Sequence, residues 1–227
     1  MTQKRVFTEA ELKEMSERTR DLIDKAIESG DKERTRSLNH RMYAEWLSMH
    51  DLYRDWSTSL LSYIYEHDGM EAYYEALKKS CTDWFKPLFD SMEREESFRR
   101  KVEMFAMGLR GHLQPMEIEE DDDRVTLKMC PCGSGERLIK SGGYEAPKNF
   151  SLIKEPNLVT FGQPYFPIYC THTPMLEILQ VEWTGYLRIV CDVPDDIKMG
   201  GCRFCLYKDP KAVPERFYTR IGKTKPR

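Results

Sequence analysis

The chain has 227 residues, of which 40% are hydrophobic and 32% are charged, and its formal net charge is −3. This length is enough for one large domain or two small ones with a buried core. A general nucleic-acid-binding protein usually carries a basic excess, so the charge argues against that class. Apolar runs such as 59–65 are far shorter than the roughly 20 residues that cross a bilayer. We therefore expect no nucleic acid and no membrane among the partners.

The N-terminal half has the patterns of helices. Thr8 stands three residues before Glu11, which is the spacing of a capping box, and predicts a first helix that runs to about Ser29. The segment 34–69 is the most periodic of the chain, and Gly69 is expected to end its helix. Two more helices are predicted at 70–85, ended by Pro87, and at 95–113, ended by Gly111 and Pro115.

The pattern changes after residue 116, where short β-like segments begin. Residues 117–123 hold six carboxylates and one isoleucine, which we interpret as a solvated turn, with a cation-facing loop as the alternative. Strands are predicted at 124–129, 176–183, 186–193 and 202–208, with a short turn at 182–186 between the second and the third.

Together these patterns predict an α+β fold, in which a helical N-terminal half packs on a smaller mixed, mostly antiparallel region that carries the cysteines. The predicted division is a helical region at 1–116, a cysteine-rich region at 117–210 and a basic tail at 211–227. We expect the tail to be frayed. The charged N-terminus lacks the apolar core of a signal peptide, so a cytoplasmic protein is expected.

Six of the seven cysteines lie after residue 129. Cytosolic thiols stay reduced, so a cluster of them points to metal binding or catalysis rather than to disulfides. Thiolates and imidazole suit zinc or iron, and a tetrahedral site needs four such ligands. The candidate metal ligands are Cys130, Cys132, Cys170, His172, Cys202 and Cys205.

Strand geometry limits how these ligands could combine. Cys130 and Cys132 share a face wherever the local chain is extended. Cys202 and Cys205 would face opposite sides of a regular strand, so a turn would be needed to bring both to one ion. The alternative is that most of these cysteines are buried and inert, since free cysteine is among the most buried residue types.

The turn at 132–137 is also typical of a nucleophilic site. Its sequence, Cys-Gly-Ser-Gly-Glu-Arg, presents consecutive backbone N–H groups that can cradle an anion or an oxyanion. A reactive thiolate at Cys132 needs an electropositive setting, which Arg137, His112 or His172 could provide. The alternative is a glycine turn that leads out of a strand without a chemical role.

An apolar stripe rich in aromatic residues marks one face of the helix predicted at 34–69. His50 lies on this stripe between Trp46 and Tyr53, and Asp51 is adjacent. A histidine among apolar residues is usually a satisfied core residue. The alternative is that the stripe lines a ligand cavity, with His50 or Asp51 at its wall.

Several segments together resemble the L-2-amino-thiazoline-4-carboxylic acid hydrolase family. They are HDLYRDW at 50–56, the stretch from EDDDRVTLKM through CPCGSGERL to KSGGY at 120–144, PIYCTH at 167–172 and GGCRFCLYKDP at 200–210. The segments VEWTG and CRFCLY are also similar to the last strands of 4-vinyl-reductase-type domains, which are small-molecule or metal-binding sensor modules.

The first resemblance implies a hydrolase that opens a small, heteroatom-rich substrate at an amidine- or amide-like carbon, and so cleaves a C–N bond other than a peptide bond. It implies that Cys132 is the nucleophile or a metal ligand, completed by Cys170 and Cys202. Arg137 would hold a substrate carboxylate. Residues that would close or line the substrate pocket are Asp51, His50, Trp46, Tyr53 and Ser134.

Three functions therefore remain open from the sequence. The first is a small-molecule hydrolase or lyase that uses a cysteine thiolate or a thiolate-bound metal at Cys132, Cys170 and Cys202. The second is a sensor module that binds a small ligand or a metal without turnover. The third is a structural zinc domain, in which metal binding would supply folding energy. The oligomeric state is left open, and an oligomer is compatible with the sequence.

Overall fold

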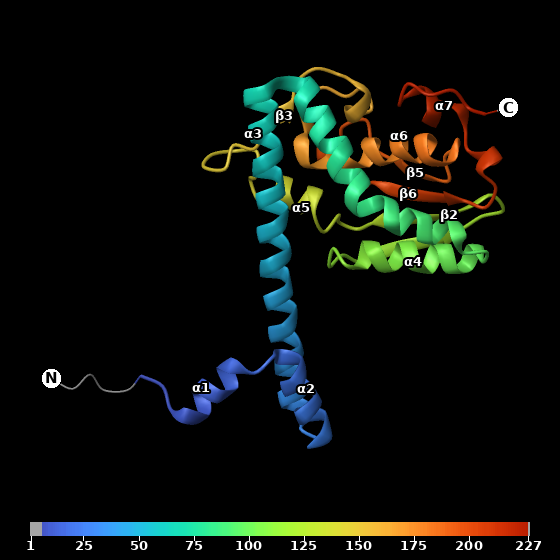
Figure 1. Cartoon of the computed structure of the whole chain (residues 1–227). Helices are drawn as coiled ribbons and strands as arrows, with labels where there is room; N and C mark the ends of the chain where they lie inside the picture. Colours follow the sequence, from blue (N-terminus) through green and yellow to red (C-terminus); the bar gives the residue numbers. More distant parts are fainter. Residues whose placement is uncertain (1–5, 227) are drawn as a thin grey trace. The chain divides into compact units, whose positions relative to one another are not determined.

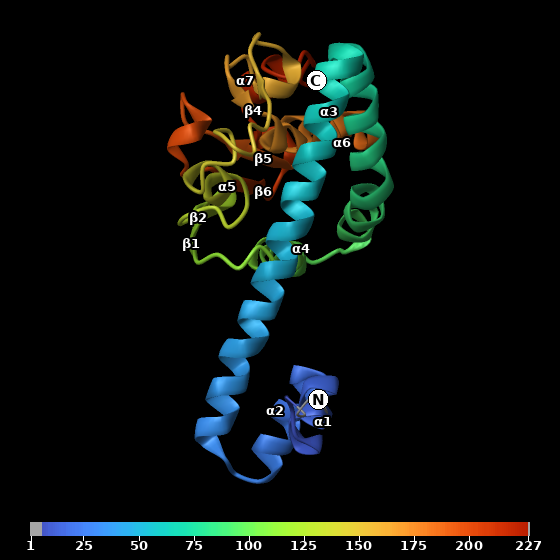
Figure 2. The same cartoon turned by 90° about the vertical axis from the view of Figure 1, so that its left-hand side faces the viewer.

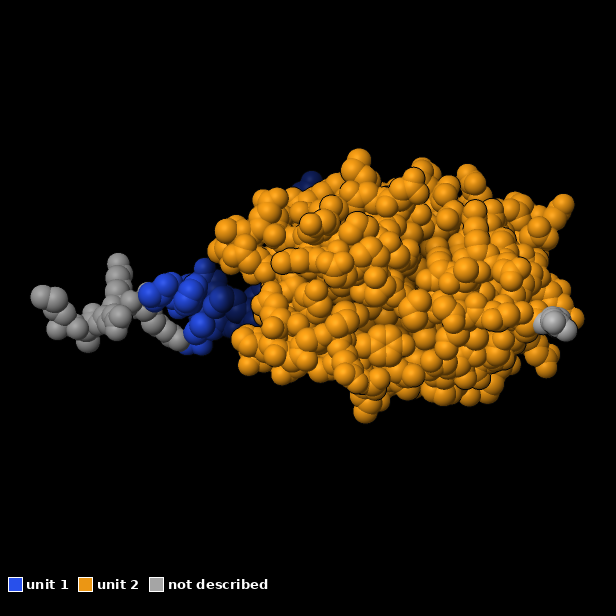
Figure 3. Space-filling view, turned by 90° about the horizontal axis from the view of Figure 1, so that it is seen from above, with its two compact units in different colours: residues 1–52 blue, residues 53–227 orange. Residues whose placement is uncertain are grey.

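The computed structural model describes residues 6–226 (Figure 1). Residues 1–5, which begin the charged N-terminus, and residue 227, which ends the basic tail, lie outside the described residues. The chain forms two compact units, residues 1–52 and residues 53–227 (Figure 3), so the division falls earlier than the expected one after residue 116. Among residues 6–226, no helix combines the length and the apolar character that a bilayer crossing requires.

The first unit is helical. The Thr8 hydroxyl accepts a hydrogen bond from the backbone N–H of Glu11, and the Glu11 carboxylate accepts one from the backbone N–H of Thr8, which confirms the predicted capping box. The single predicted helix is two helices, because the backbone is extended at Glu17 and Arg18. The elements are α1 (Glu9–Ser16), α2 (Thr19–Glu28) and the beginning of α3 (Lys32–Arg94).

The second unit begins within α3. Gly69 has φ 82° and ψ −177°, a conformation that favours glycine, and it interrupts the helix where the sequence predicts an end. After Gly69 the helix turns back toward α4 (Phe98–Arg110) (Figures 1 and 2). The prediction that Pro87 ends the helix is wrong, because α3 continues to Arg94.

A four-stranded antiparallel sheet confirms the α+β prediction. Its strand order is β1 (Met116–Glu120), β2 (Arg124–Met129), β6 (Arg203–Tyr207) and β5 (Ile189–Asp192). The acidic run at 117–123 is therefore only partly a turn, because residues 116–120 form an edge strand. Charged side chains suit an edge, since they discourage further strand pairing. A second, two-stranded sheet pairs β3 (Leu152–Ile153) with β4 (Phe166–Pro167).

The strand predicted at 176–183 is instead part of helix α6 (His172–Thr184). Met175, Ile178 and Leu179 are all buried in it. A helix that is apolar on most sides produces a continuous hydrophobic run, which periodicity cannot distinguish from a buried strand. Gly185 ends α6 in the left-handed conformation, with φ 82°.

Two hydrophobic clusters cover the two faces of the sheet. On one face, α4 packs against β2 and β6 through residues such as Phe105, Leu127 and Leu206. On the other face, α6 packs against β5 and β6 (Figure 1). The C-terminal helix α7 (Glu215–Thr219) buries Phe217 and Tyr218 in this second cluster. The expectation of a frayed tail is therefore wrong for its described part.

Candidate functional site

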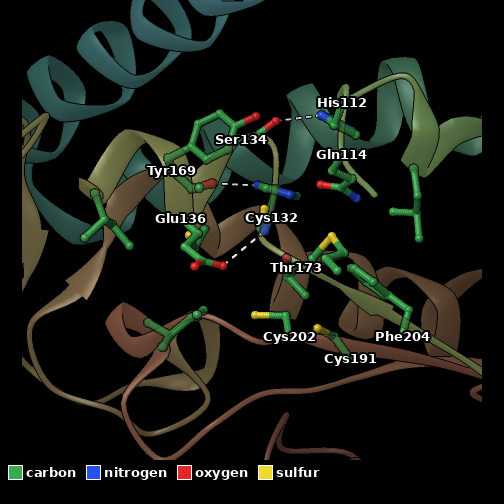
Figure 4. A pocket seen from close by; sticks show the side chains of 18 residues that line it. His112, Gln114, Cys132, Ser134, Glu136, Tyr169, Thr173, Cys191, Cys202 and Phe204 are labelled. Atoms are coloured by element: carbon green, nitrogen blue, oxygen red, sulfur yellow. Dashed lines mark hydrogen bonds between the residues drawn. The ribbon is translucent and has the colours of Figure 1, made fainter. Parts of the chain in front are cut away.

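A small cavity of about 70 Å³ lies beside the end of β2, where α4, α5 (Gly135–Lys140), the start of α6 and the strands β5 and β6 meet (Figure 4). A cavity of about 150 Å³ binds benzene and a single water needs about 10–15 Å³, so this one can hold a few waters or a very small molecule. Four cysteines reach it, together with two histidines and apolar side chains. The residues used below are His112, Cys132, Ser134, Glu136, Tyr169, Cys170, His172, Cys191 and Cys202.

The glycines of the turn after β2 allow the backbone to approach its neighbours closely. A Cβ atom at Gly133 would lie 1.9 Å from the carbonyl oxygen of His112, and one at Gly135 would lie 2.7 Å from the Sγ atom of Cys170. Real Cβ contacts are not this short. At Gly133 the clash is with backbone, so only glycine fits there, whereas a larger residue at Gly135 would have to displace the Cys170 side chain. The turn can therefore place Cys132 and Ser134 at the cavity.

The Cys132 thiol lines the cavity and is mainly protonated at neutral pH. Burial raises its pKa, and hydrogen bonds from the backbone N–H groups of Glu136 and Ser134 oppose this effect only in part. The backbone N–H of Cys132 donates to the Glu136 carboxylate at 3.0 Å. The predicted nucleophile is thus in the cavity, but its surroundings do not favour the thiolate.

Cys202 is the acidic thiol of the cavity. In the antiparallel pair of β5 and β6, Cys191 is opposite Phe204, two residues beyond Cys202. The two cysteine side chains lie next to each other (Figure 4). A hydrogen bond with Cys191 lowers the pKa of the Cys202 thiol, and this effect outweighs burial. Burial raises the pKa values of Cys191 and Cys170 well above the usual range.

A chain of hydrogen bonds runs along one wall of the cavity. The Nδ1 atom of His112 lies 2.7 Å from the Ser134 hydroxyl oxygen (Figure 4). The Tyr169 hydroxyl also bonds to Ser134, and burial raises the pKa of Tyr169 to about 12. A hydroxyl bonded to an imidazole has the arrangement of a nucleophile beside its general base.

His172 presents a neutral imidazole to the cavity. Its Nδ1 atom lies 2.6 Å from the carbonyl oxygen of Tyr169. A carbonyl can only accept, so Nδ1 carries the hydrogen, and the lone pair of the neutral ring is on Nε2. Burial lowers the pKa of His172, and the bond to Tyr169 opposes this only in part. The side chain can therefore act as a proton acceptor at neutral pH.

This burial predicts a loss of stability in acid. As the pH falls below about 6.5, the unfolded chain protonates His172 while the folded chain does not, so the free energy of unfolding decreases. One such group gives at most about 1.4 kcal/mol per pH unit. We expect the free energy of unfolding in urea to decrease between about pH 7.5 and about pH 5.5. This decrease should be smaller in His172→Gln than in the wild type. His67→Gln, on the exposed side of α3, is the control and should show the same decrease in the free energy of unfolding as the wild type. Equal decreases in the wild type and in His172→Gln would contradict the prediction.

The structure brings only part of the candidate metal set together. Cys132, Cys170, His172 and Cys202 line the cavity. Cys205 lies on the other face of β6, with its Sγ atom 3.7 Å from the Thr126 hydroxyl, because side chains alternate along a strand. The Sγ atom of Cys130 lies 3.7 Å from the carbonyl oxygen of Lys128, outside the cavity. Within residues 6–226, no three His, Cys, Asp or Glu side chains are arranged to hold one metal ion, so the six candidates do not form the predicted site as placed.

Of the other predicted site residues, some line the cavity and some do not. His112 and Ser134 line the cavity, whereas Arg137 does not, because α5 turns Glu136 and Ile139 toward it instead. His50 and Asp51 belong to the first unit, where the His50 Nδ1 and Asp51 Oδ1 atoms are 3.1 Å apart. Neither of them lines this cavity, nor do Trp46 and Tyr53, which are half exposed.

Of the nine cavity residues used here, three are absent from the sequence predictions: Glu136, Tyr169 and Cys191. Cys191 is isolated in the sequence, and only the pairing of β5 with β6 brings it to Cys202. Tyr169 reaches Ser134 across a separation of 35 residues, which no local pattern reveals. Glu136 is buried and accepts hydrogen bonds from Cys132, Gly201 and Lys140, and these outweigh burial and lower its pKa. Its helical spacing of four residues from Lys140 is the one signal that sequence offers.

No family model matches the chain, and neither the curated proteins nor the solved structures contain a match. The resemblance to the L-2-amino-thiazoline-4-carboxylic acid hydrolase family therefore stays a prediction from the quoted segments.

Proposed function

We propose that the chain is a small-molecule hydrolase or lyase that acts on a C–N bond and uses the Cys202 thiolate in the cysteine-lined cavity. The observation that carries the proposal is the hydrogen bond between Cys191 and Cys202, which lowers the pKa of a thiol that lines a cavity. The thiolate is the nucleophilic form of cysteine, and reactive cysteines are those with lowered pKa values in partly accessible sites.

The groups around the cavity suit such a reaction. The Cys202 sulfur would form a bond to an amidine- or amide-like carbon while the electron pair of the C=N or C=O bond moves to nitrogen or oxygen. The bond to the leaving nitrogen would then break, and that nitrogen would take a proton from a water molecule in the cavity. Nε2 of His172 can accept a proton from the water that releases the product from Cys202. The cavity limits the part of the substrate that enters to a few atoms.

We expect Cys202 to react with iodoacetamide at a lower pH than the other buried thiols. Labelling followed by peptide mass spectrometry should place the half-maximal rate of Cys202 below about pH 8.5, the ordinary thiol value, and those of Cys132 and Cys170 above it. Cys191→Ala removes the hydrogen bond and should move the profile of Cys202 upward. Two results would contradict the proposed thiolate. One is a pH profile of labelling for Cys202 that equals the profile of Cys170, and the other is a Cys202 profile that does not change in Cys191→Ala.

Turnover is tested with 2-amino-thiazoline-4-carboxylic acid and a panel of small cyclic amidines and amides. Cys202→Ser should reduce turnover by about 100-fold or more, because the hydroxyl is a far weaker nucleophile at its ordinary pKa. Cys130→Ser is the matched control, since its sulfur lies outside the cavity, and it should keep full activity. Activity that survives in Cys202→Ser would overturn the proposed role of this residue.

The second candidate is a module that binds a small ligand without turnover. It is favoured by the raised pKa values of Cys132, Cys170 and Cys191, which keep three of the four thiols of the cavity protonated and unreactive. A ligand that protects Cys202 from iodoacetamide and is recovered unchanged would support this candidate over the enzyme. The structural zinc alternative has no three-ligand group among residues 6–226 to support it.

A further inference from the structure

One side-chain donor at the cysteine-lined cavity lacks an acceptor. Gln114 lines the cavity and is 7% exposed. Figure 4 shows its side chain extending from beneath His112 toward the other labelled residues of the cavity. The Nε2 atom is buried, and within residues 6–226 it has no hydrogen-bond partner. A buried amide N–H₂ group without an acceptor loses its bonds to water and gains none, so it points to a ligand atom that accepts from it.

The other end of the amide fixes which atom faces the cavity. The Oε1 atom of Gln114 accepts a hydrogen bond from the backbone N–H of Gly133 at 2.5 Å. A backbone N–H can only donate, so the atom next to Gly133 is the oxygen and the atom without a partner is the nitrogen. The ligand atom that satisfies Gln114 must therefore be a hydrogen-bond acceptor.

The backbone on both sides of Gln114 is held in place. Leu113 has φ 59°, a left-handed conformation that a leucine seldom adopts, and its N–H donates to the carbonyl oxygen of Arg110 at 2.9 Å. The carbonyl oxygen of Pro115 accepts a hydrogen bond from the backbone N–H of Cys130 at 3.1 Å. These bonds tie the segment to α4 and to the end of β2, so the Nε2 donor is in position before a ligand binds.

The charges at the cavity favour a neutral ligand over a carboxylate. The Cys202 thiol and the Glu136 carboxylate both line the cavity, whereas the described residues that line it include no lysine or arginine. A ligand carboxylate would therefore be repelled by Glu136 and by the Cys202 thiolate. A neutral amide avoids this repulsion. Its carbonyl oxygen can accept from Gln114, and its N–H can donate to the lone pair on Nε2 of His172.

The same donor disfavours a protonated amidine. An amidinium group has N–H donors and no acceptor, so it would leave the Nε2 group of Gln114 unpaired and place N–H groups against each other. A site that is built to bond one polar group rejects a close analogue without that group, because its own buried group is then left without a partner.

We propose that the Nε2 group of Gln114 binds the carbonyl oxygen of a neutral amide, and that the substrates of the cavity are small amides, cyclic amides included, rather than amidines or carboxylates. This inference rests on the proposed function, because it names the substrate class of the same cavity. Gln114 is the residue that recognises the substrate oxygen.

NMR titration of the full chain with acetamide and with acetamidinium tests the proposal. The two compounds have the same number of non-hydrogen atoms, and ligands this small are expected to bind in the millimolar range or more weakly. The side-chain N–H₂ signals of Gln114 are assigned by through-bond correlation. Up to about 100 mM, they should shift with acetamide and not with acetamidinium. No shift with acetamide, or equal shifts with both compounds, would overturn the proposal.

Gln114→Glu keeps the oxygen that accepts from Gly133 and replaces the Nε2 donor by a second oxygen. Backbone signals of the cavity should then show acetamide binding about 10-fold more weakly or worse, and acetamidinium binding more tightly than in the wild type. Gln163→Glu is the matched control. Gln163 does not line the cavity and its Oε1 atom also accepts a backbone N–H, that of Ile197, so both affinities should stay unchanged. Equal acetamide affinities in Gln114→Glu and the wild type would contradict the proposal.

Turnover separates the failure of this inference from the failure of the proposed function. Amide recognition stands and the hydrolase fails where acetamide shifts the Gln114 signals but no amide of the panel is converted. The hydrolase stands and the inference fails where turnover requires Cys202 but is the same in Gln114→Glu as in the wild type. Circular dichroism checks that Gln114→Glu is folded, and the wild-type comparison of acetamide with acetamidinium decides the inference where it is not.

Discussion

Replacement of Glu177 by alanine is expected to lower the free energy of unfolding by about 3–5 kcal/mol, because it breaks a buried ion pair on one side only. Glu177 lies on α6 and is 2% exposed. Its Oε1 atom is 2.6 Å from the Arg220 Nη2 atom and accepts a hydrogen bond from the backbone N–H of Cys191, also at 2.6 Å. Alanine would leave the Arg220 guanidinium partly buried without its carboxylate, and would leave a strand N–H without its acceptor.

Urea unfolding followed by circular dichroism measures this effect. Burial raises the pKa of Glu177 to about 7 although Arg220 opposes it, so the experiment is made at about pH 8, where the carboxylate is mainly ionised. Glu182→Ala on the same helix is the matched control. Glu182 pairs with Lys78 and Lys223 at the surface, and its loss should cost less than about 1 kcal/mol. Similar losses in the two variants would show that the buried pair is not a major support of the fold.

Glu177 also connects the core to the candidate site. It holds the backbone of Cys191, and the Cys191 side chain lowers the pKa of Cys202. Loss of Glu177 should therefore raise the pKa of the Cys202 thiol as well as lower the free energy of unfolding. The same ion pair thus connects α6 to the backbone of β5, the edge strand that carries Cys191.

The parts of the fold that the sequence predicts are those with local causes. The capping box at Thr8 and the interruption at Gly69 depend on a few adjacent residues, and the alternation of 124–129 gives β2 its observed limits. The strand predicted at 176–183 fails because a buried helix and a buried strand are both continuously apolar.

The cavity depends on contacts that no local pattern contains. The sequence predicts the turn at Cys132, because glycines mark it. It names both Ser134 and His112 as candidates, but it does not show that they are in contact. The partnership of Cys191 with Cys202 follows from strand pairing. The α3 stripe is predicted as core or cavity wall because periodicity identifies a face of a helix but not the direction in which it points. In the second unit Tyr53 and Leu60 of this stripe are more than half exposed, whereas Leu61 and Ile64 pack against the core.

Gly133→Ala is expected to destabilise the protein by about 3 kcal/mol and to disrupt the candidate site, because overpacking against rigid backbone cannot be relieved by a side-chain rotation. The added Cβ would meet the His112 carbonyl oxygen at 1.9 Å and the carbonyl carbon at 2.9 Å. Either the turn or the segment after α4 would have to move. This movement would separate His112 from the Ser134 hydroxyl, and it would displace the Gly133 N–H from the Gln114 side chain to which it donates.

Gly108→Ala provides the opposite control in the same part of the molecule. Gly108 lies within α4, and a Cβ there would have nothing within 4 Å. Alanine is the better helix former, so this variant should be stabilised by about 0.5–1 kcal/mol. The two substitutions add the same methyl group, and their effects on urea unfolding should have opposite signs. Two effects of the same sign would mean that the turn after β2 yields easily, and that the positions of Cys132 and Ser134 do not depend on the close approach at Gly133.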